Sequence, residues 1–180
     1  MRTHSALAAA NWFLDQGEAK KATLSPMKLQ KLIYFAHGWS LAITGVPLIE
    51  EHPEAWDYGP VIPTVYHEFK KFGRNPITQR ATKLDFDGSG SIEDFLSAKI
   101  FEPRITDDSD ADALLNRVWE VYGGLSGIQL SNMTHVENGA WHKAYHGLAN
   151  GRRGVDIPDD LIKDEFLAKM PSDPAQTKTS

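Results

Sequence analysis

The sequence predicts a mostly α-helical α+β fold, a single globular domain of about six to seven helices around a central apolar helix, with a short β or extended element. The strongest observation is the segment 25–44, in which apolar residues leave almost no polar face. The second is a set of shorter segments with apolar residues at helical spacing and capping residues before them. The third is a length of 180 residues without cysteine, enough to bury a core without disulfides.

The central helix is predicted to run from Pro26 to about Thr44. Ser25 is a favourable N-cap, and Pro26 suits the first helical position because its missing N–H would have no helical partner there. Gly45 and Pro47 then end the segment. A helix with so little polar surface is expected to be covered by other elements on most sides.

Two lysines in the first turns of this helix, Lys28 and Lys31, are not explained by core packing. The positive end of a helix dipole disfavours each cation by roughly 0.3–1 kcal/mol. Solvent screening would remove much of this penalty if both side chains are exposed. The alternative hypothesis is that both lysines face an acidic partner.

A short extended run follows the central helix at residues 54–63. Gly59 and Pro60 are predicted to turn this run into another helix. Glycine is expected at the corner because the turn needs a positive φ or a close backbone approach. Trp56 and Tyr58 are expected to leave the run and pack on the central helix.

Shorter helices are predicted around these two elements from apolar spacing and capping residues. Gly17 is expected to end the first of them, and the acidic run 107–112 to cap a later one. Residues 77–86 are predicted to form a short strand or an extended arm because they include β-branched residues. The predicted helices are residues 5–16, 61–72, 92–99, 111–122, 126–133, 139–145 and 157–169.

The acidic glycine loop at residues 85–93 begins like an EF-hand calcium loop. Asp85, Asp87 and Ser89 stand at the first, third and fifth positions, but the twelfth position is Leu96 in place of a bidentate glutamate. We therefore expect no calcium binding of physiological affinity. The simpler interpretation is a glycine-rich turn that leads into a short helix.

Composition and charge argue against nucleic-acid-binding, membrane and secreted proteins. The formal charge is −5, with 19 Lys and Arg against 24 Asp and Glu, which disfavours binding to a phosphate backbone. No apolar run approaches the length of a membrane span and no signal peptide pattern is present, so we expect a cytoplasmic protein without membrane contact. Residues 1–170 are predicted to form the one domain, and residues 171–180 a disordered tail.

No group of residues indicates catalysis, a metal site or a cofactor. The pair His135 and Glu137 resembles the His-x-Glu of zinc deaminases, but those enzymes also need cysteine ligands. His142 and His146 could share a helix face, but no third ligand stands at a motif spacing. His37 is interpreted as a core histidine that is hydrogen-bonded to backbone. We therefore expect a protein without enzymatic activity and without a cofactor.

Three ordered motifs resemble a known family. They are Lys-Leu-x-Lys-Leu-x-Tyr at residues 28–34, Glu-Ala-Trp-x-Tyr-Gly-Pro-Val at 54–61 and Leu-Ser-x-x-Thr-His-x-Glu-x-x-x-Trp at 130–141. Over roughly residues 7–146 the chain resembles the Panacea family, also called SocA-like antitoxin domains, many of which lie in phage and prophage genomes. The sequence departs from the family pattern before Trp141, where a proline is expected directly ahead of the tryptophan and Ala140 stands instead.

The resemblance implies a non-enzymatic antitoxin that binds its cognate toxin directly, with a protease complex as a further partner in the adaptor type. An alternative is a nucleic-acid-binding phage regulator that uses two basic clusters, Lys20 to Lys31 and Lys70 to Arg74. The hypothesis for partner contacts comprises Lys28, Lys31, Tyr66, Thr134 and His135. The family-motif positions expected to be structural are Tyr34, Trp56, Tyr58, Gly59, Pro60 and Trp141.

Overall fold

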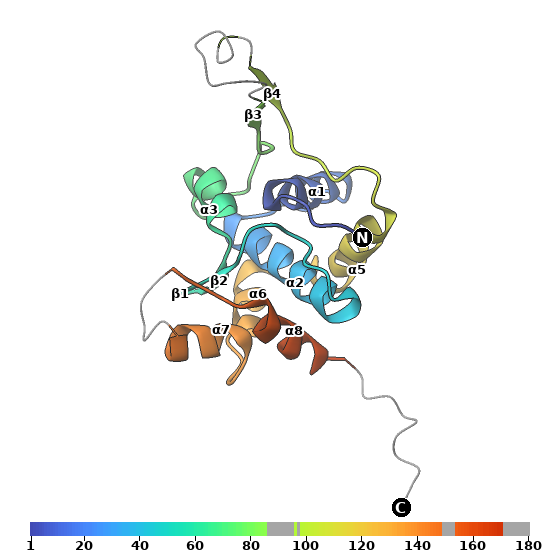
Figure 1. Ribbon diagram of the computed structural model, residues 1–180. Helices are drawn as coiled ribbons and strands as arrows, with labels where there is room; N and C mark the ends of the chain where they lie inside the picture. Colours follow the sequence, from blue (N-terminus) through green and yellow to red (C-terminus); the bar gives the residue numbers. More distant parts are fainter. Residues whose placement is uncertain (86–95, 97, 149–153, 171–180) are drawn as a thin grey trace, which may run out of the picture.

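The structure is a computed structural model that describes residues 1–85, 96, 98–148 and 154–170 (Figure 1). The predicted disordered tail, the acidic glycine loop beyond Asp85 and most of the helix expected at 92–99 lie outside the described residues.

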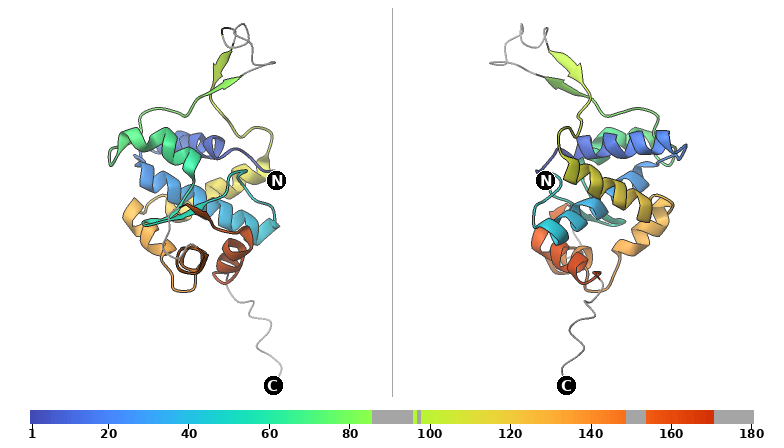
Figure 2. Two further views of the ribbon diagram at one scale, coloured as in Figure 1. Left: turned by 60° about the vertical axis from the view of Figure 1, so that its left-hand side comes forward. Right: turned by 90° about the vertical axis from the view of Figure 1, so that its right-hand side faces the viewer.

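The central helix is α2 (Pro26–Thr44), with the predicted bounds. The Ser25 side chain accepts a hydrogen bond from the Lys28 amide, and Gly45 closes the helix in the left-handed conformation with a φ of 74°. Helices α1 (Ala6–Ala19), α5 (Ser109–Tyr122), α6 (Gly127–Thr134) and α8 (Asp159–Leu167) all contact α2 (Figures 1 and 2). The mostly helical α+β fold around a central helix is therefore confirmed.

Three of the surrounding helices in the described residues begin with a side-chain cap, at Ser5, Asp108 and Ser126. Ser126 caps α6 with its side chain and forms a full capping box with Gln129. The expected end of the first helix is wrong, because that helix continues past Gly17, where a Cβ atom would lie 2.2 Å from a side-chain carbon of Leu24. The elements are α1 (Ala6–Ala19), α3 (Pro63–Phe69) with the 3-10 turn η1 (Lys70–Phe72), α5 (Ser109–Tyr122), α6 (Gly127–Thr134), α7 (Ala140–His142) with the π-helical segment η2 (Lys143–Leu148), and α8 (Asp159–Leu167).

Close packing of α8 on α2 joins the end of the described chain to its centre. A Cβ atom at Gly38 would lie 2.3 Å from a ring carbon of Phe166, so glycine is required for this approach. The Phe166 ring makes edge-to-face contacts with Tyr34 and Trp39 at centroid distances of 5.9 and 5.3 Å. Aromatic packing therefore holds α8 against α2.

His37 and Tyr34 lie one turn apart on the buried side of α2. The expected backbone partner of His37 is wrong, because its Nε2 lies 3.1 Å from Asp159 Oδ1 at the start of α8. This hydrogen bond lowers the pKa of Asp159. Tyr34 is fully buried, and this burial, with a smaller contribution from Glu165, raises the pKa of its hydroxyl.

A small antiparallel sheet lies beside α2, with β1 (Glu54–Trp56) between β2 (Gly59–Val61) and β5 (Val155–Asp156). Trp56 pairs with Gly59, so Asp57 and Tyr58 form the turn of the β1–β2 hairpin. The predicted corner at Gly59 and Pro60 is therefore misplaced, because these two residues begin the second strand.

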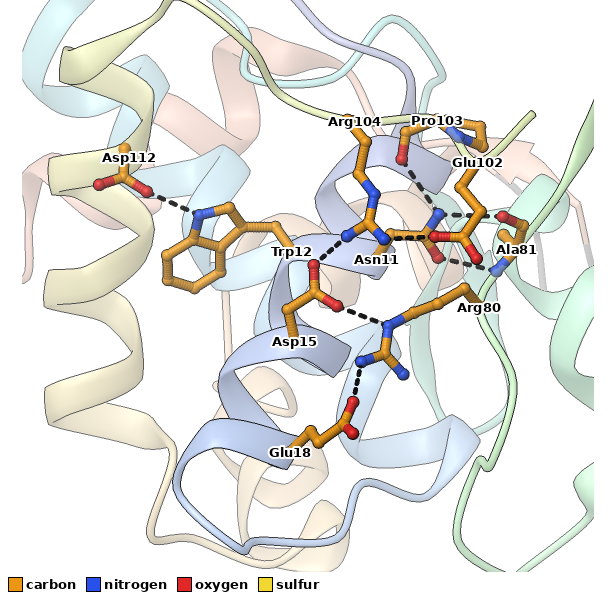
Figure 3. Close-up of polar contacts among 10 residues, drawn as sticks. All are labelled: Asn11, Trp12, Asp15, Glu18, Arg80, Ala81, Glu102, Pro103, Arg104 and Asp112. Carbon is orange, nitrogen blue, oxygen red and sulfur yellow. Dashed lines mark hydrogen bonds and ion pairs between the residues drawn. The ribbon is translucent and has the colours of Figure 1, made fainter.

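A second hairpin, β3 (Lys83–Asp85) and β4 (Lys99–Phe101), projects from the helical body as an arm (Figures 1 and 2). It confirms the strand expected within residues 77–86. Both segments that lead into the arm are held by Asn11, a fully buried residue of α1. Its side-chain amide donates to the carbonyl oxygens of Ala81 and Pro103, each at 3.0 Å, and its oxygen accepts from the Ala81 amide at 2.7 Å (Figure 3).

Ion pairs support the base of this arm from the exposed side of α1. Arg80 forms ion pairs with Asp15 at 2.6 Å and with Glu18 at 2.5 Å (Figure 3). Arg104 forms ion pairs with Asp15 and Glu102. Because these groups are partly exposed, each pair contributes little by itself. The buried amide of Asn11 is the stronger anchor, since its loss would leave backbone groups unsatisfied.

Candidate partner-binding site

A pocket of about 310 Å³ opens between the first half of α2, the β1–β2 hairpin and the α3–η1 segment. We call it the hairpin pocket. Its volume is at the lower end of the range for ligand sites, enough for a side chain or a small molecule. Two residues from each of the three elements define it: Met27 and Lys31, Trp56 and Tyr58, and Tyr66 and Lys70.

Aromatic rings form the outer wall of the hairpin pocket. The rings of Trp56 and Tyr66 meet edge to face with their centroids 4.8 Å apart, and Trp56 Nε1 donates to Glu54 Oε2 at 2.8 Å. The expectation that Tyr58 packs on α2 is wrong, because the hairpin turn leaves its side chain 70% exposed at the pocket mouth. Trp56 is half-buried and lines the pocket beside residues of α2.

Lys31 crosses from α2 to the back of the hairpin and is only 1% exposed. Its ammonium group donates to the carbonyl oxygens of Tyr58 at 2.8 Å and Pro60 at 2.9 Å. Burial lowers the pKa of Lys31 to about 7, and no carboxylate of the described residues lies within ion-pair distance. The expectation of an exposed lysine is wrong, because hairpin carbonyls bind the side chain inside the fold.

Gly59 allows this convergence at the hairpin. Its φ is +93°, which confirms the predicted positive φ. A Cβ atom there would lie 2.8 Å from Lys31 Nζ and 2.6 Å from Thr134 Oγ1, which confirms the close approach as well. His135 is the third neighbour, at 3.3 Å from that position. At Gly59, which has no side chain, the hairpin therefore approaches both α2 and the end of α6.

The distal motif holds the hairpin from the other side. Ser131 Oγ donates to the Tyr58 carbonyl at 3.0 Å, and Trp141 Nε1 donates to the Trp56 carbonyl at 2.8 Å. Buried Thr134 donates to the Ser131 carbonyl, His135 Nδ1 lies 2.7 Å from the same carbonyl oxygen, and the centroids of the His135 and Trp141 rings are 4.2 Å apart. Ser131 and Trp141 therefore bind the backbone of the hairpin turn from the side opposite α2.

Lys28 lies away from the hairpin pocket, although it is only one turn from Lys31. Its Nζ donates to the Gly123 carbonyl at 2.6 Å and lies 5.9 Å from the Trp119 ring centroid. Burial lowers the pKa of Lys28. The two lysines therefore do not share one surface, and the basic cluster expected from Lys20 to Lys31 does not form as a single exposed patch.

Lys70 and Gln30 also line the pocket; neither was among the predicted partner contacts, although Lys70 belongs to the basic cluster of the nucleic-acid alternative. Lys70 lies on the pocket wall, and its Nζ faces His67 Nδ1 at 3.4 Å. Gln30 is buried and binds the backbone of Ile62 through both its amide nitrogen and its oxygen, at 3.1 and 2.8 Å. A polar residue inside an apolar helix was the available signal for Gln30, since buried amides need partners.

The remaining histidine pair lies at the end of α7 and in η2, with the ring centroids of His142 and His146 4.6 Å apart. Within the described ranges, no three His, Asp or Glu side chains gather as a metal site would require. Of the helices that the structure describes, none has the length and apolar character of a membrane span.

Comparisons with known proteins agree with the three motifs. The family model for the SocA-like antitoxin Panacea domain matches residues 29–142. Antitoxin SocA of Caulobacter vibrioides (strain NA1000 / CB15N) is 38% identical over 162 residues, which cover 89% of this chain and 81% of that protein. No solved structure matches the chain. The match extends across the helices and the hairpin that build the pocket, and the chain therefore belongs to the Panacea family of SocA-like antitoxin domains.

Proposed function

We propose that this protein is an antitoxin that neutralises a cognate toxin by binding it directly, without catalysis. The observation that carries the proposal is the similarity to antitoxin SocA over 89% of the chain. The hairpin pocket supports it, because aromatic residues beside a solvent-accessible hollow are typical of protein interfaces. Two finer parts of the proposal come from the family resemblance: delivery of the toxin to a protease, and an origin in a phage or prophage genome.

We place the contact surface on the hairpin face. Tyr66 is 37% exposed and His135 is an exposed residue, so both can touch a partner. Lys31 and Thr134 are buried, and in the proposal they position the hairpin rather than contact the toxin. Lys28 would take part only through its exposed surface near the end of α5.

Co-expression with the product of the adjoining reading frame tests the proposal. That product should stop growth when expressed alone, and growth should return when this protein is present. The two proteins should also co-purify as a complex. A toxic product that remains toxic in the presence of this protein, and does not co-purify with it, would contradict direct neutralisation.

Protease delivery can be separated from neutralisation by measuring toxin lifetime. If this protein is also an adaptor, the half-life of the toxin should fall when both are present, and the fall should disappear in cells that lack the protease. Rescue of growth with an unchanged toxin half-life would contradict the adaptor role and show that the toxin is neutralised by binding alone.

Nucleic-acid binding is the second candidate function, and one observation favours it. Lys70, Lys71 and Arg74 are exposed, and none of them has a carboxylate partner among the described residues. The net charge of −5 opposes it. A regulator of this kind should retard DNA in a gel and lose affinity steeply with salt, whereas an antitoxin should not.

A further inference from the structure

We propose that the hairpin pocket binds an acidic segment of a protein partner through one apolar or aromatic anchor residue. The inference rests on the proposed function, because the toxin is the partner in question, and it adds the chemistry by which that partner is recognised. Two independent observations carry it: the shape and lining of the pocket, and the uncompensated positive charge beside it.

Size and lining favour a single anchor side chain. A volume of about 310 Å³ is small for a ligand site and mostly bounded by apolar and aromatic groups. Met27 of α2 and Val61 of β2 contribute apolar groups to the lining, while Trp56 and Tyr66 form a wall. Anchor residues that enter such walls are typical of the energetic centre of an interface.

The charge beside the pocket favours acidic flanks for that anchor. The segment 67–74 contains Lys70, Lys71 and Arg74 against one acid, Glu68, in a chain whose net charge is −5. Lys70 lines the pocket, and Lys71 and Arg74 adjoin the lining residues Lys70 and Gly73. Complementary charge at a rim of this kind increases the rate of encounter and selects the partner.

Several cations elsewhere in the described residues already pair with a carboxylate, whereas none of Lys70, Lys71 and Arg74 does. Arg80, Arg104, Arg117 and Lys169 each form an ion pair with a carboxylate. Lys70 instead faces His67, and Lys71 bonds the neutral side chain of Gln79 at 3.0 Å.

The acidic residues of the hairpin do not compensate for this charge. Glu54 accepts the indole hydrogen bond of Trp56, and Asp57 accepts one from the hydroxyl of Tyr145 at 2.9 Å. Both carboxylates are thus engaged with aromatic side chains of the fold. The positive rim on the α3–η1 side is left for acidic groups of a partner.

Three synthetic peptides provide the direct test: one with a central phenylalanine flanked by glutamates, one with the same phenylalanine flanked by lysines, and one with alanine between glutamates. The protein has five tryptophans, so its indole N–H signals in a nitrogen-15 correlation spectrum can be assigned by substitution. The first peptide should shift the Trp56 indole signal, and the other two should not. An unmoved Trp56 signal with the first peptide, or an equal shift with the lysine peptide, would overturn the proposal.

Variants of the pocket sharpen the test. The double change Lys70→Glu and Lys71→Glu should lower the affinity for the first peptide by about tenfold or more and allow the lysine peptide to bind. Because the Tyr66 ring is proposed as a central contact, Tyr66→Ala should lower the affinity for the first peptide by about thirtyfold. Matched controls are Lys83→Glu with Lys99→Glu and, for the ring, Phe101→Ala, all on the exposed arm. Equal effects of pocket and arm variants would contradict a specific site.

Co-expression separates this inference from the proposed function. If the unchanged protein rescues growth and both pocket variants rescue equally, the pocket is not the contact site, although neutralisation stands. If the unchanged protein fails to rescue, neutralisation is wrong, and the peptide titration still decides whether the pocket takes an acidic, anchored segment.

Discussion

Lys31 Nζ lies 2.8 Å from the carbonyl oxygen of Tyr58, so a lysine of the central helix holds the turn of a hairpin that begins more than twenty residues later. A second bond, to the Pro60 carbonyl at 2.9 Å, completes the link. The hairpin side of the pocket is therefore held by a buried lysine. The stability of this protein should depend on that cation more than on any exposed lysine.

Charge reversal at Lys31 should unfold the protein readily. Lys31→Glu places a carboxylate against two carbonyl oxygens in a buried site, and we expect a loss of about 3–5 kcal/mol in the free energy of unfolding. Lys28→Glu is the comparison. It loses one hydrogen bond but puts glutamate at the third position of α2, where it completes a capping box with Ser25, so its cost should stay near 1 kcal/mol. Urea unfolding measures both, and equal losses would contradict the different environments of the two lysines.

The same lysine should make stability depend on pH. The pKa of Lys31 is about 7 in the folded chain and near 10.5 in the unfolded chain. Between these values the unfolded chain binds more protons, so stability gains from Lys31 as pH rises through this window, and below it the full cost of burying the charge is present. The difference in unfolding free energy between the unchanged protein and Lys31→Met should therefore grow in favour of the unchanged protein as pH rises above about 7. A constant difference would show that the pKa of Lys31 is not lowered.

Gly59→Ala should destabilise the hairpin for two separable reasons. The positive φ costs roughly 1–3 kcal/mol for a residue with a side chain, and the added Cβ would overlap Thr134 Oγ1 and Lys31 Nζ. Gly73→Ala isolates the first reason, because its φ is +57° and no atom lies within 4 Å of the new Cβ. Gly124→Ala has neither problem and should be nearly neutral. Thermal unfolding should rank the losses in that order, and an alanine at position 59 no worse than one at position 73 would contradict the close approach.

Asn11→Ala should loosen the base of the arm. The change leaves the Ala81 amide and the carbonyl oxygens of Ala81 and Pro103 without their buried partner, and we expect a loss of about 2–4 kcal/mol. Hydrogen exchange at the Ala81 amide should accelerate strongly. Asn116→Ala, which removes bonds at a more exposed position on α5, is the control and should cost less than about 1 kcal/mol. Unchanged exchange at Ala81 would show that the arm is anchored in another way.

Tyr34→Phe should leave stability unchanged or raise it slightly. The tyrosine hydroxyl is buried and has no hydrogen-bond partner in the described part of the protein, and such a group costs about 1–3 kcal/mol. Tyr34→Leu is the contrast, since it also loses the edge-to-face contact with Phe166 and should destabilise. Chemical denaturation of the two variants distinguishes them. A large loss for Tyr34→Phe would mean that the hydroxyl is satisfied in solution.

The sequence by itself determined the central helix and its ends. The helix ends are set by Ser25, Pro26 and Gly45 through capping and backbone geometry. These effects depend only on residues a few positions away, so they do not require the tertiary structure. The capping of α6 by Ser126 and the positive φ of Gly59 were predictable for the same reason. The mostly helical class follows from apolar periodicity, which is also local.

Only the tertiary structure decided where Lys31 and Tyr58 lie. In a helix that is apolar on nearly every side, periodicity does not tell which face a lysine takes, and the partners of Lys31 are carbonyl groups that carry no sequence signal. Pairing of Trp56 with Gly59 places Tyr58 in the hairpin turn, where it is exposed, and packing of the hairpin against α2 brings the Tyr58 carbonyl within reach of Lys31. The lysine and the turn are far apart in the sequence, so no local pattern predicts their contact.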